Sequence, residues 1–286
     1  NIVFSGGVAL NCTAISKLEN ISNLNIWVQP AAGDCGGAIG CALFYSNLFN
    51  FKNKNFNIKN KEIVFLGPSY NEEKISNTLT KINVNFDKLP DDILIDYVTK
   101  NLLMGNVIGW FEGKMEFGPR ALGARSILAD PRNKDMKNII NKKIKKRESF
   151  RPFAPSVLEE HASKYFHIEE KSEFMTKTFK VKKEFENKLP SVVHIDGTSR
   201  IQTVSKFNKS KFRKLIENFY NKTQCPLILN TSFNVRGEPM VCSPEDAINC
   251  FFNSGLDLLI IENFIVKKSN NKKIISKFKT RIFPLD

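Results

Sequence analysis

The stretch 113–126 combines three glycines with the cations Lys114, Arg120 and Arg125, directly after an apolar run at 107–111 that predicts a strand. Glycine lets the backbone bend and approach a ligand closely. A guanidinium presents a planar fork that matches phosphate or carboxylate oxygens, whereas a lysine ammonium is a compact point charge. The pattern favours a binding site for a small, highly charged anion. A basic surface loop with turn glycines is the alternative, because glycines and cations alone have low specificity.

Three later segments repeat the combination of an apolar run with arginine and hydrogen-bonding side chains. Residues 147–155 place arginines among prolines, which restrict the backbone and hold a guanidinium in place. Residues 192–202 alternate like a strand around a turn, and 226–239 has the pattern of a buried strand that ends in a polar loop. Strand ends that converge with such loops form sites for polyanionic ligands. The predicted members are Arg151, His194, Arg200, Asn230, Thr231, Ser232 and Arg236.

Together these motifs resemble those of the carbamoyltransferases of nodulation and antibiotic O-carbamoylation. The resemblance runs from Asn1 to about Val266, and the motifs keep the order found in that family. Six motifs in one order are far more specific than any single motif. They are Ser5–Asn11, Gly33–Ala38, Gly113–Ser126, Arg151–Pro155, His194–Arg200 and Asn230–Asn234.

The resemblance implies a two-domain enzyme. The first domain of the family resembles the tRNA threonylcarbamoyl transferases, with an actin and sugar-kinase-like fold, and moves a carbamoyl group onto a hydroxyl of the acceptor. The second resembles the threonylcarbamoyl-AMP synthase fold and makes carbamoyl-adenylate from carbamoyl phosphate and ATP. We therefore predict that residues 1–57 are the tail of the first domain and that 58–286 form the second. The Lys- and Asn-rich stretch 51–61 is the expected linker.

The metal site of the family is expected to be incomplete in this chain. The family's metal-binding histidine pair lies upstream of the Ser5 motif, whereas the histidines here are His161, His167 and His194. The resemblance aligns Asp34 with the aspartate that binds the catalytic divalent metal, iron or a similar ion. The other interpretation of Asp34 is a helix cap. We expect a fragment that has lost most of the first domain and, with it, the transfer step.

The N-terminal turn has two interpretations that stay open. Ser5, Gly6 and Gly7 lie between a predicted strand at 1–4 and a predicted helix at 11–18, which begins at Asn11. Backbone N–H groups at such a helix start bind phosphate. The alternative is a tight turn with no ligand.

A mechanism follows from the resemblance and the cations. Adenylation brings two polyanions together, and fixed cations offset their repulsion and stabilise the charge that develops at phosphorus. We assign this role to Lys114, Arg120, Arg151, Arg125 and Arg200. Hydrogen bonds to phosphate oxygens or to the carbamoyl amide are assigned to Asn230, Thr231 and Ser232, and contact with the nucleotide phosphates to Arg236. Magnesium is expected to accompany ATP through phosphate oxygens and water.

Two side chains near these cations each have two possible roles. His194 is either a general acid or ligand-binding group, or a packed histidine of a strand. Glu116 either orients Lys114 or an arginine, or forms an exposed, weak ion pair.

Composition sets wider limits. The net charge is +14, and its densest run, 142–147, is either a solvated helix face or part of a funnel for anions. The six cysteines form no CxxC pair, which favours buried free thiols in a reducing compartment and a cytoplasmic protein. We see no run apolar enough to span a bilayer. The expected partners are carbamoyl phosphate, ATP and a hydroxyl-bearing small molecule, with a homodimer possible.

Two rival functions remain: a nucleic-acid-binding module of the kind that acts on tRNA, and a nucleotide-binding fragment without catalysis. The first is disfavoured because the arginines lie in glycine and proline loops and not on one aromatic-interleaved face.

Alternating strands and helices predict an α/β fold with a mixed, twisted sheet. The expected strands are 1–4, 26–30, 62–66, 107–111, 126–129, 192–195, 226–229 and 258–261. The expected helices are 11–18, one opened by 33–37 that runs through 38 to about 48, 71–81, 90–104, 133–145, 209–222 and 244–253, the last with a Ser243 cap and Pro244 in its first turn.

Overall fold

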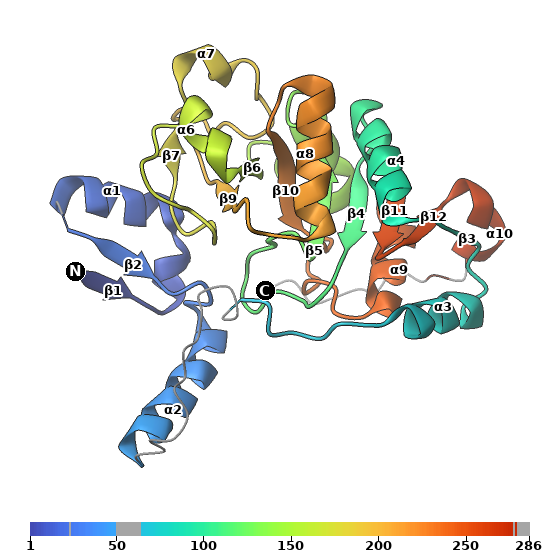
Figure 1. Ribbon diagram of the computed structural model, residues 1–286, viewed down its shortest axis with the longest axis horizontal. Coiled ribbons are helices and arrows are strands. Elements are labelled where there is room, and N and C mark those ends of the chain that lie inside the picture. The colour runs from blue at the N-terminus through green and yellow to red at the C-terminus, as the bar shows by residue number, and fades with distance from the viewer. Residues whose placement is uncertain (23, 50–63, 277, 279–286) are drawn as a thin grey trace.

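A computed structural model describes residues 1–22, 24–49, 64–276 and 278 (Figure 1). The chain forms a small N-terminal part and a larger body. In the N-terminal part, strands β1 (Ile2–Phe4) and β2 (Ile26–Val28) pair in parallel. Helix α1 (Cys12–Ser22) connects them along the chain. Helix α2 (Asp34–Leu48) follows and extends away from the rest of the molecule.

An eight-stranded mixed sheet forms the body, in the order β3-β12-β11-β4-β5-β10-β6-β9. The pairs β11·β4 and β6·β9 are parallel and the other neighbours are antiparallel. The predicted mixed α/β architecture is therefore confirmed. The strands are β3 (Phe86–Lys88), β4 (Ile108–Phe111), β5 (Arg125–Ala129), β6 (Ala154–Leu158), β9 (Gln202–Val204), β10 (Leu227–Ser232), β11 (Leu258–Ile261) and β12 (Phe264–Lys267).

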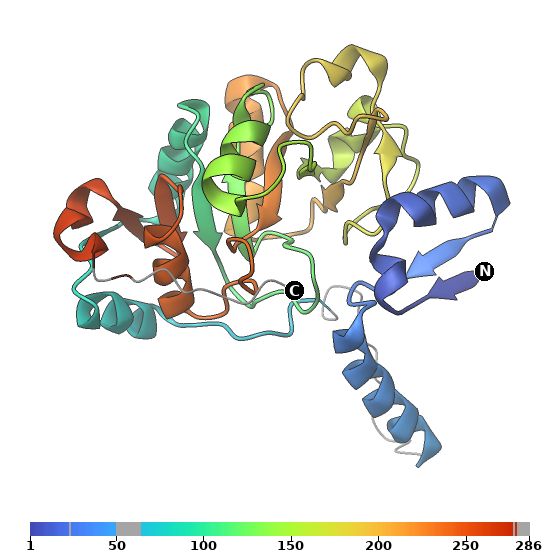
Figure 2. The same ribbon diagram turned by 180° about the vertical axis from the view of Figure 1, so that it is seen from behind.

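Helices cover both faces of this sheet. Helices α4 (Asp91–Leu103) and α8 (Lys211–Thr223) lie side by side on the face toward the viewer in Figure 1. Helix α5 (Met136–Ile140) lies on the opposite face, as Figure 2 shows. Every residue of β4, β5 and β6 is buried, as expected for strands covered on both sides.

The remaining helices include two that pack against each other and several short ones. Helix α3 (Glu72–Lys81) begins at the predicted place, with Asn71 as its cap. Helix α9 (Pro244–Phe252) has the predicted Ser243 cap, and Asp246 completes a capping box. The short elements are α6 (Ala162–Tyr165), α7 (Lys183–Glu186) and α10 (Lys272–Ile275), with the two-stranded ribbon β7 (Phe179–Lys180) and β8 (Thr198–Ser199).

Several predicted elements differ from the structure. The segment 192–195 is not a strand but part of a turn that leads into β8. Of the predicted strand 62–66, residues 62 and 63 lie outside the described residues, and Val64–Leu66 are not in a strand. The predicted helix 133–145 begins only at Met136 and ends in a π-helical turn, Asn141–Lys145.

Strand β6 was missed because Pro155 interrupts its pattern. Pro155 pairs with Leu229 of β10, whereas the pairing of β6 with β9 begins only at Ser156. The missing N–H of Pro155 therefore costs no ladder hydrogen bond on the β9 side.

The two parts of the chain are in direct contact. The backbone N–H of Thr178 donates to Ser16 Oγ at 2.8 Å, and Lys177 Nζ lies 2.8 Å from Glu19 Oε1. The predicted linker and the boundary at residues 57 and 58 lie outside the described residues, so the domain limits stay a prediction. No helix in the described ranges has the length and apolar character needed to cross a membrane.

Cysteines in the described chain are free thiols, as predicted. Cys225 and Cys250 are buried, but Cys35 and Cys41 lie exposed on α2, where burial was expected.

Candidate active site

The loop 118–124 is held from one side by Glu116. This carboxylate is buried, and its Oε1 accepts the N–H groups of Leu122 at 2.7 Å, Ala124 at 2.7 Å and Arg125 at 3.2 Å. Burial raises the pKa of Glu116. Neither prediction for Glu116 was right, because its partners are backbone amides. A carboxylate inside the loop fixes the backbone that carries Arg120.

Two amide side chains of the sheet hold the same loop from the other side. Asn230 Nδ2 donates to the Ala121 carbonyl at 3.2 Å, and Gln202 Nε2 donates to the Leu122 carbonyl at 2.9 Å. Gly123 adopts a φ of +108°, and a Cβ there would lie 2.3 Å from the Phe212 ring. The loop therefore needs glycine at this position for both its backbone angle and its packing.

Arg120 of this loop is one of four arginines whose charges act on one another, here called the arginine cluster: Arg120, Arg147, Arg151 and Arg200. Burial, and then the charge of Arg200, lower the pKa of Arg120 to about 10. Burial, and then the charges of Arg151 and Arg200, lower the pKa of Arg147 to about 10. Cations that depress one another's pKa in this way gain from any anion placed between them.

The cluster is held in place by neighbours. Arg120 donates to the Leu10 carbonyl of the N-terminal part at 2.7 Å. Asn141, which is buried, accepts from Arg147 Nε at 2.7 Å and donates to the Arg151 carbonyl at 3.0 Å. Arg151 itself is exposed and pairs with Glu148 at 2.9 Å. Asn141 adds to the prolines in holding this segment.

Lys145 is a site residue that the sequence analysis did not identify. Its side chain is buried, and Nζ donates to the carbonyl and Oγ of Ser232, at 2.5 and 3.1 Å, and to the carbonyl and Oδ1 of Asn234, at 3.1 and 2.6 Å. Burial, and then the charge of Arg147, lower its pKa to about 7. The neutral oxygens occupy the N–H groups of Lys145 but do not balance its charge, so an anion placed nearby would stabilise the ammonium form.

The π-helical turn Asn141–Lys145 explains why the sequence analysis did not identify Lys145. It turns Ile144 and Lys145 inward, while Lys142, Lys143 and Lys146 stay exposed. The basic run is thus a solvated face with one buried lysine, and helical periodicity alone gives no sign of this. Single π-turns occur often at functional sites.

The loop 230–234 meets the arginine cluster through Lys145. Thr231 and Ser232 are half-buried, and Ser232 Oγ donates to Asn234 Oδ1 at 2.8 Å. Arg236, which is exposed, donates to the Lys146 carbonyl at 3.2 Å and so lies beside the basic run. Asn230 is buried and serves the loop 118–124, which favours a structural role over the predicted ligand contact.

His194 lies at the border of the cluster, in a turn. Its Nδ1 is 3.0 Å from Thr198 Oγ1, which in turn donates to Asp196 Oδ1 at 2.6 Å. Burial lowers the pKa of His194 to about 4, with Arg200 and Lys137 acting in the same direction and Asp196 against them. The imidazole is therefore neutral at pH 7, which argues against a general acid and leaves a ligand-binding group or a packed, hydrogen-bonded histidine.

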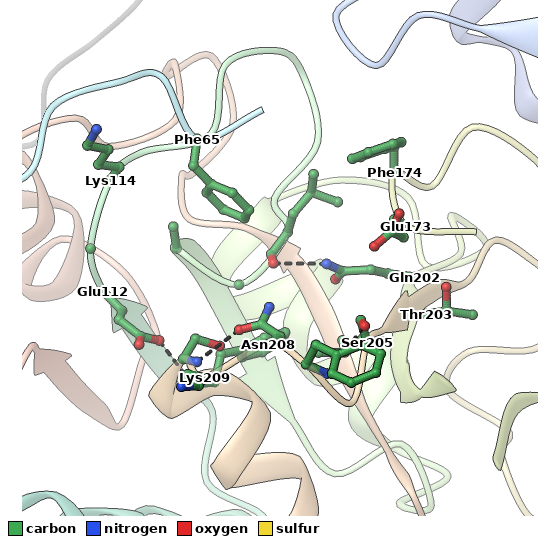
Figure 3. A pocket seen from close by; sticks show the side chains of 18 residues that line it. Phe65, Glu112, Lys114, Glu173, Phe174, Gln202, Thr203, Ser205, Asn208 and Lys209 are labelled. Atoms are coloured by element: carbon green, nitrogen blue, oxygen red, sulfur yellow. Dashed lines mark hydrogen bonds between the residues drawn. The ribbon is translucent and has the colours of Figure 1, made fainter. Parts of the chain in front are cut away.

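Lys114 lines a pocket that lies apart from the arginine cluster. This pocket has a volume of about 410 Å³ and lies between the loops at 112–114 and 122–124, strand β9 and the start of α8 (Figure 3). None of the four clustered arginines is in its lining. Lys114 is exposed, and Figure 3 shows it at one edge of the pocket.

The structure argues against a ligand-binding role for Arg125. Its side chain is fully buried, and the guanidinium donates to the carbonyls of Glu112, Gly113, Ala124 and Pro68 at 3.0–3.2 Å. It lies 3.4 Å from the centre of the Phe111 ring. Buried carbonyls thus occupy a guanidinium that was predicted to bind phosphate.

The N-terminal motif differs from the prediction in one respect. The turn Ser5–Gly6–Gly7 is exposed, but a 3₁₀ turn (Gly7–Leu10) separates it from α1. Asn11 Oδ1 accepts the N–H of Ala14 and so caps α1. The free helix start that was predicted to bind phosphate therefore does not adjoin the glycines.

Asp34 does not reach a set of metal ligands. It is exposed and opens α2 without capping it, because Gly33 is the cap residue and no side-chain cap bond forms. Across the described ranges, no three His, Cys, Asp or Glu side chains gather as a metal would need. The donor set present does not fit a transition-metal ion, which needs several such ligands.

Comparison with known proteins identifies the family. The model for the carbamoyltransferase C-terminus matches residues 99–268, and the model for the carbamoyltransferase N-terminus matches 1–43. The chain belongs to the carbamoyltransferase family. Both the arginine cluster and Lys145 lie within the segment that matches the C-terminal model of this family.

Similar carbamoyltransferase-family proteins include nodulation proteins. Nodulation protein NolO of Bradyrhizobium diazoefficiens is 41% identical over 93% of this chain and 49% of its own length. Nodulation protein NolNO of Sinorhizobium fredii is 39% identical over 92% of this chain and 39% of its own length. The chain thus spans about half or less of the relatives it matches.

A solved structure of full-length HypF is also similar, with a TM-score of 0.43 and 18% identity over 64% of this chain and 23% of that one. A likeness at this level carries no argument about function.

Proposed function

We propose that this chain performs the carbamoyl-activating step of an ATP-dependent O-carbamoyltransferase. Water and carbamoyl phosphate would yield carbamate and phosphate, and a carbamate oxygen would then attack the α-phosphorus of ATP. The products of this second step are carbamoyl-adenylate and pyrophosphate. In the whole protein the carbamoyl group would pass to a hydroxyl of a sugar or secondary metabolite, and AMP would leave.

The arginine cluster is the observation that carries this proposal. Arg120 and Arg147 are partly buried, and the charge of Arg200 helps to lower the pKa of both. Lys145, in the π-helical turn, is close enough for the charge of Arg147 to help lower its pKa. Fixed cations of this kind offset the repulsion between two polyanions and stabilise the charge that develops as phosphorus is attacked. Ser232 and Asn234 would complete the contacts to phosphate or to the carbamoyl group.

Magnesium and the divalent metal of the transfer step have different roles in this proposal. Magnesium would arrive with ATP and be held mainly by phosphate oxygens and water. The divalent metal of the transfer step would need ligands beyond Asp34, so that step is assigned to the whole protein and not to this chain.

Pyrophosphate release tests the proposal directly. We expect release from ATP and magnesium only when carbamoyl phosphate is present. Arg120→Ala and Arg151→Ala should each lower it by about 10²–10³-fold, as loss of one preorganised electrostatic contact does. Lys142→Ala, an exposed member of the basic run, is the matched control and should keep full turnover.

Two results would contradict the proposed function. Full turnover in both arginine variants would remove the cluster from the chemistry. Salt-sensitive binding of RNA with no response to ATP would instead support the nucleic-acid-binding function.

A further inference from the structure

Asn141 is a buried amide that holds the segment 147–151 through several hydrogen bonds. Its Oδ1 accepts from Arg147 Nε at 2.7 Å. Its Nδ2 donates to the carbonyls of Ser149 and Arg151, at 3.3 and 3.0 Å. Its own carbonyl accepts the backbone N–H of Arg147 at 3.1 Å. One residue therefore fixes both the backbone of this segment and one guanidinium of the arginine cluster.

The orientation of the Asn141 amide is set by these bonds. An amide offers donors only at nitrogen and acceptors only at oxygen, so a flipped amide would place an oxygen against two carbonyls and an NH₂ group against the guanidinium. A buried polar group without a partner is costly, so the observed orientation is kept. The Phe153 ring, whose centre lies 5.0 Å from the guanidinium carbon of Arg147, limits that group from a second side.

The π-helical turn Asn141–Lys145 brings Asn141 into the body. Asn141 and Lys145 are both buried in it. The turn ends at Lys146, whose backbone is left-handed with a φ of +46° and whose N–H also bonds the Asn141 carbonyl. One turn therefore carries the amide that holds Arg147 and the buried lysine of the site.

A neutral amide leaves the positive charge of Arg147 unbalanced. Arg213 shows the other arrangement, because the carboxylates of Glu160 and Glu217 lie 2.5 and 2.9 Å from its nitrogens and balance its charge. Asn141 uses only Nε of Arg147, and among the described residues no hydrogen bond or ion pair occupies the two terminal nitrogens. Paired guanidinium nitrogens of this kind make bidentate contacts to phosphate oxygens.

We propose that Asn141 is a positioning residue of the arginine cluster, which fixes Arg147 and the path of the segment 147–151 for the anions of the activation step. The inference rests on the proposed function and adds to it a residue that contacts no substrate. Cations that are fixed before the substrates arrive need no reorganisation during the reaction. Loss of the amide therefore lowers the rate although every charge of the cluster remains.

A double-mutant cycle tests whether Asn141 acts through Arg147. Carbamoyl-phosphate-dependent pyrophosphate release and the affinity for tripolyphosphate are measured for Asn141→Ala, Arg147→Ala and the double variant. Asn141→Ala should lower turnover by about 10²-fold, the effect of a misplaced group, and weaken tripolyphosphate by about tenfold. The double variant should lie within about threefold of Arg147→Ala in both measurements, because the amide then has no guanidinium to position.

Asn271→Ala is the matched control for loss of a buried asparagine. Asn271 Nδ2 donates to the carbonyls of Asn85 and Lys267 at 2.9 and 2.8 Å, beside β3 and β12, at the other end of the sheet from β6 and β9. This variant should lower the urea midpoint as Asn141→Ala does and leave turnover unchanged. Asn141→Asp is a second variant of the same size. Its second oxygen would face two carbonyls and its charge would offset that of Arg147, so turnover should fall by about tenfold or more.

Three results would overturn the positioning role while the proposed function stands. They are full turnover in both Asn141 variants, losses that multiply in the double variant, and an equal loss of turnover in Asn271→Ala. If the unsubstituted chain released no pyrophosphate, the proposed function would fail, and the tripolyphosphate cycle would decide the positioning role separately. Coupled effects of Asn141 and Arg147 on that affinity would support the role, and independent effects, or no binding at all, would overturn it.

Discussion

Lys145 is buried and bonded to neutral oxygens, and the pKa of its amine can be measured. Its four acceptors are oxygens of Ser232 and Asn234, and its pKa is lowered to about 7 by burial and by Arg147. At pH 8 the amine is therefore mostly neutral in the free protein. An anion bound beside it favours the ammonium form and raises the pKa.

We predict that tripolyphosphate binding at pH 8 takes up a proton at Lys145. The observed heat should then vary with the ionisation enthalpy of the buffer, with up to about one proton taken up per site. Lys145→Met should lose this contribution, while Lys142→Met, whose side chain is exposed, should keep it. Equal proton uptake by the chain and by Lys145→Met would show that the lysine does not sense the anion.

At the scale of elements, the loop 118–124 is held by contacts that lie far apart in the sequence. Glu116 bonds its N–H groups, Asn230 and Gln202 bond its carbonyls, and Phe212 fills the space beside Gly123. The loop carries Arg120 and lines the pocket. Its shape therefore links the stability of the fold to the geometry of the cations.

Gly123→Ala tests this link. The positive φ costs about 1–2 kcal/mol for a residue with a Cβ, and the clash with Phe212 adds about 1–3 kcal/mol. We expect loss of stability in urea denaturation and a fall in carbamoyl-phosphate-dependent pyrophosphate release as Arg120 moves.

Gly105→Ala is the matched control, because Gly105 has a φ of +83° but its Cβ would lie no closer than 3.6 Å to Asn133. It should cost only the backbone term of about 1–2 kcal/mol and leave turnover intact. Equal losses of stability and of turnover in the two variants would show that the Phe212 contact does not position the site.

The helices and strands also show which features of the fold the sequence predicts. Long periodic segments and local caps were predicted well, as at α3, α4 and α9, because the signals lie within the segment itself. The strand β6 was missed because Pro155 is acceptable only through the offset pairing of β9, which is a tertiary fact.

The candidate site shows the same difference between local signals and tertiary contacts. The loops that carry Arg120, Arg151, Arg200 and Ser232 were predicted from residue type and motif. The burial of Lys145 and of Arg125 was not predicted, since the sequence does not say which cation of a basic segment is buried against carbonyl groups. Burial of a charge depends on the elements that pack around it, and these come from distant parts of the chain.

At the scale of the whole molecule, the N-terminal part is attached by a few polar contacts, and one of them uses a site residue. Arg120 donates to the Leu10 carbonyl, while Lys177 pairs with Glu19 and Glu170 at 2.8 Å each. Lys177 is only 13% exposed, and these two carboxylates raise its pKa. A shielded lysine between two carboxylates is worth more than an exposed pair, and its loss leaves two like charges facing each other.

We therefore predict that Lys177→Met loosens the N-terminal part without unfolding the body. Amide hydrogen exchange in α1 should become faster by roughly tenfold, the equivalent of about 1.4 kcal/mol, while exchange in β10 stays unchanged. Lys183→Met is the control, because Lys183 is 92% exposed and lies 3.6 Å from Glu186. Unchanged exchange in α1 would mean that Arg120 and Thr178 hold the N-terminal part without the ion pair. Faster exchange in both α1 and β10 would mean that the two parts unfold as one cooperative unit.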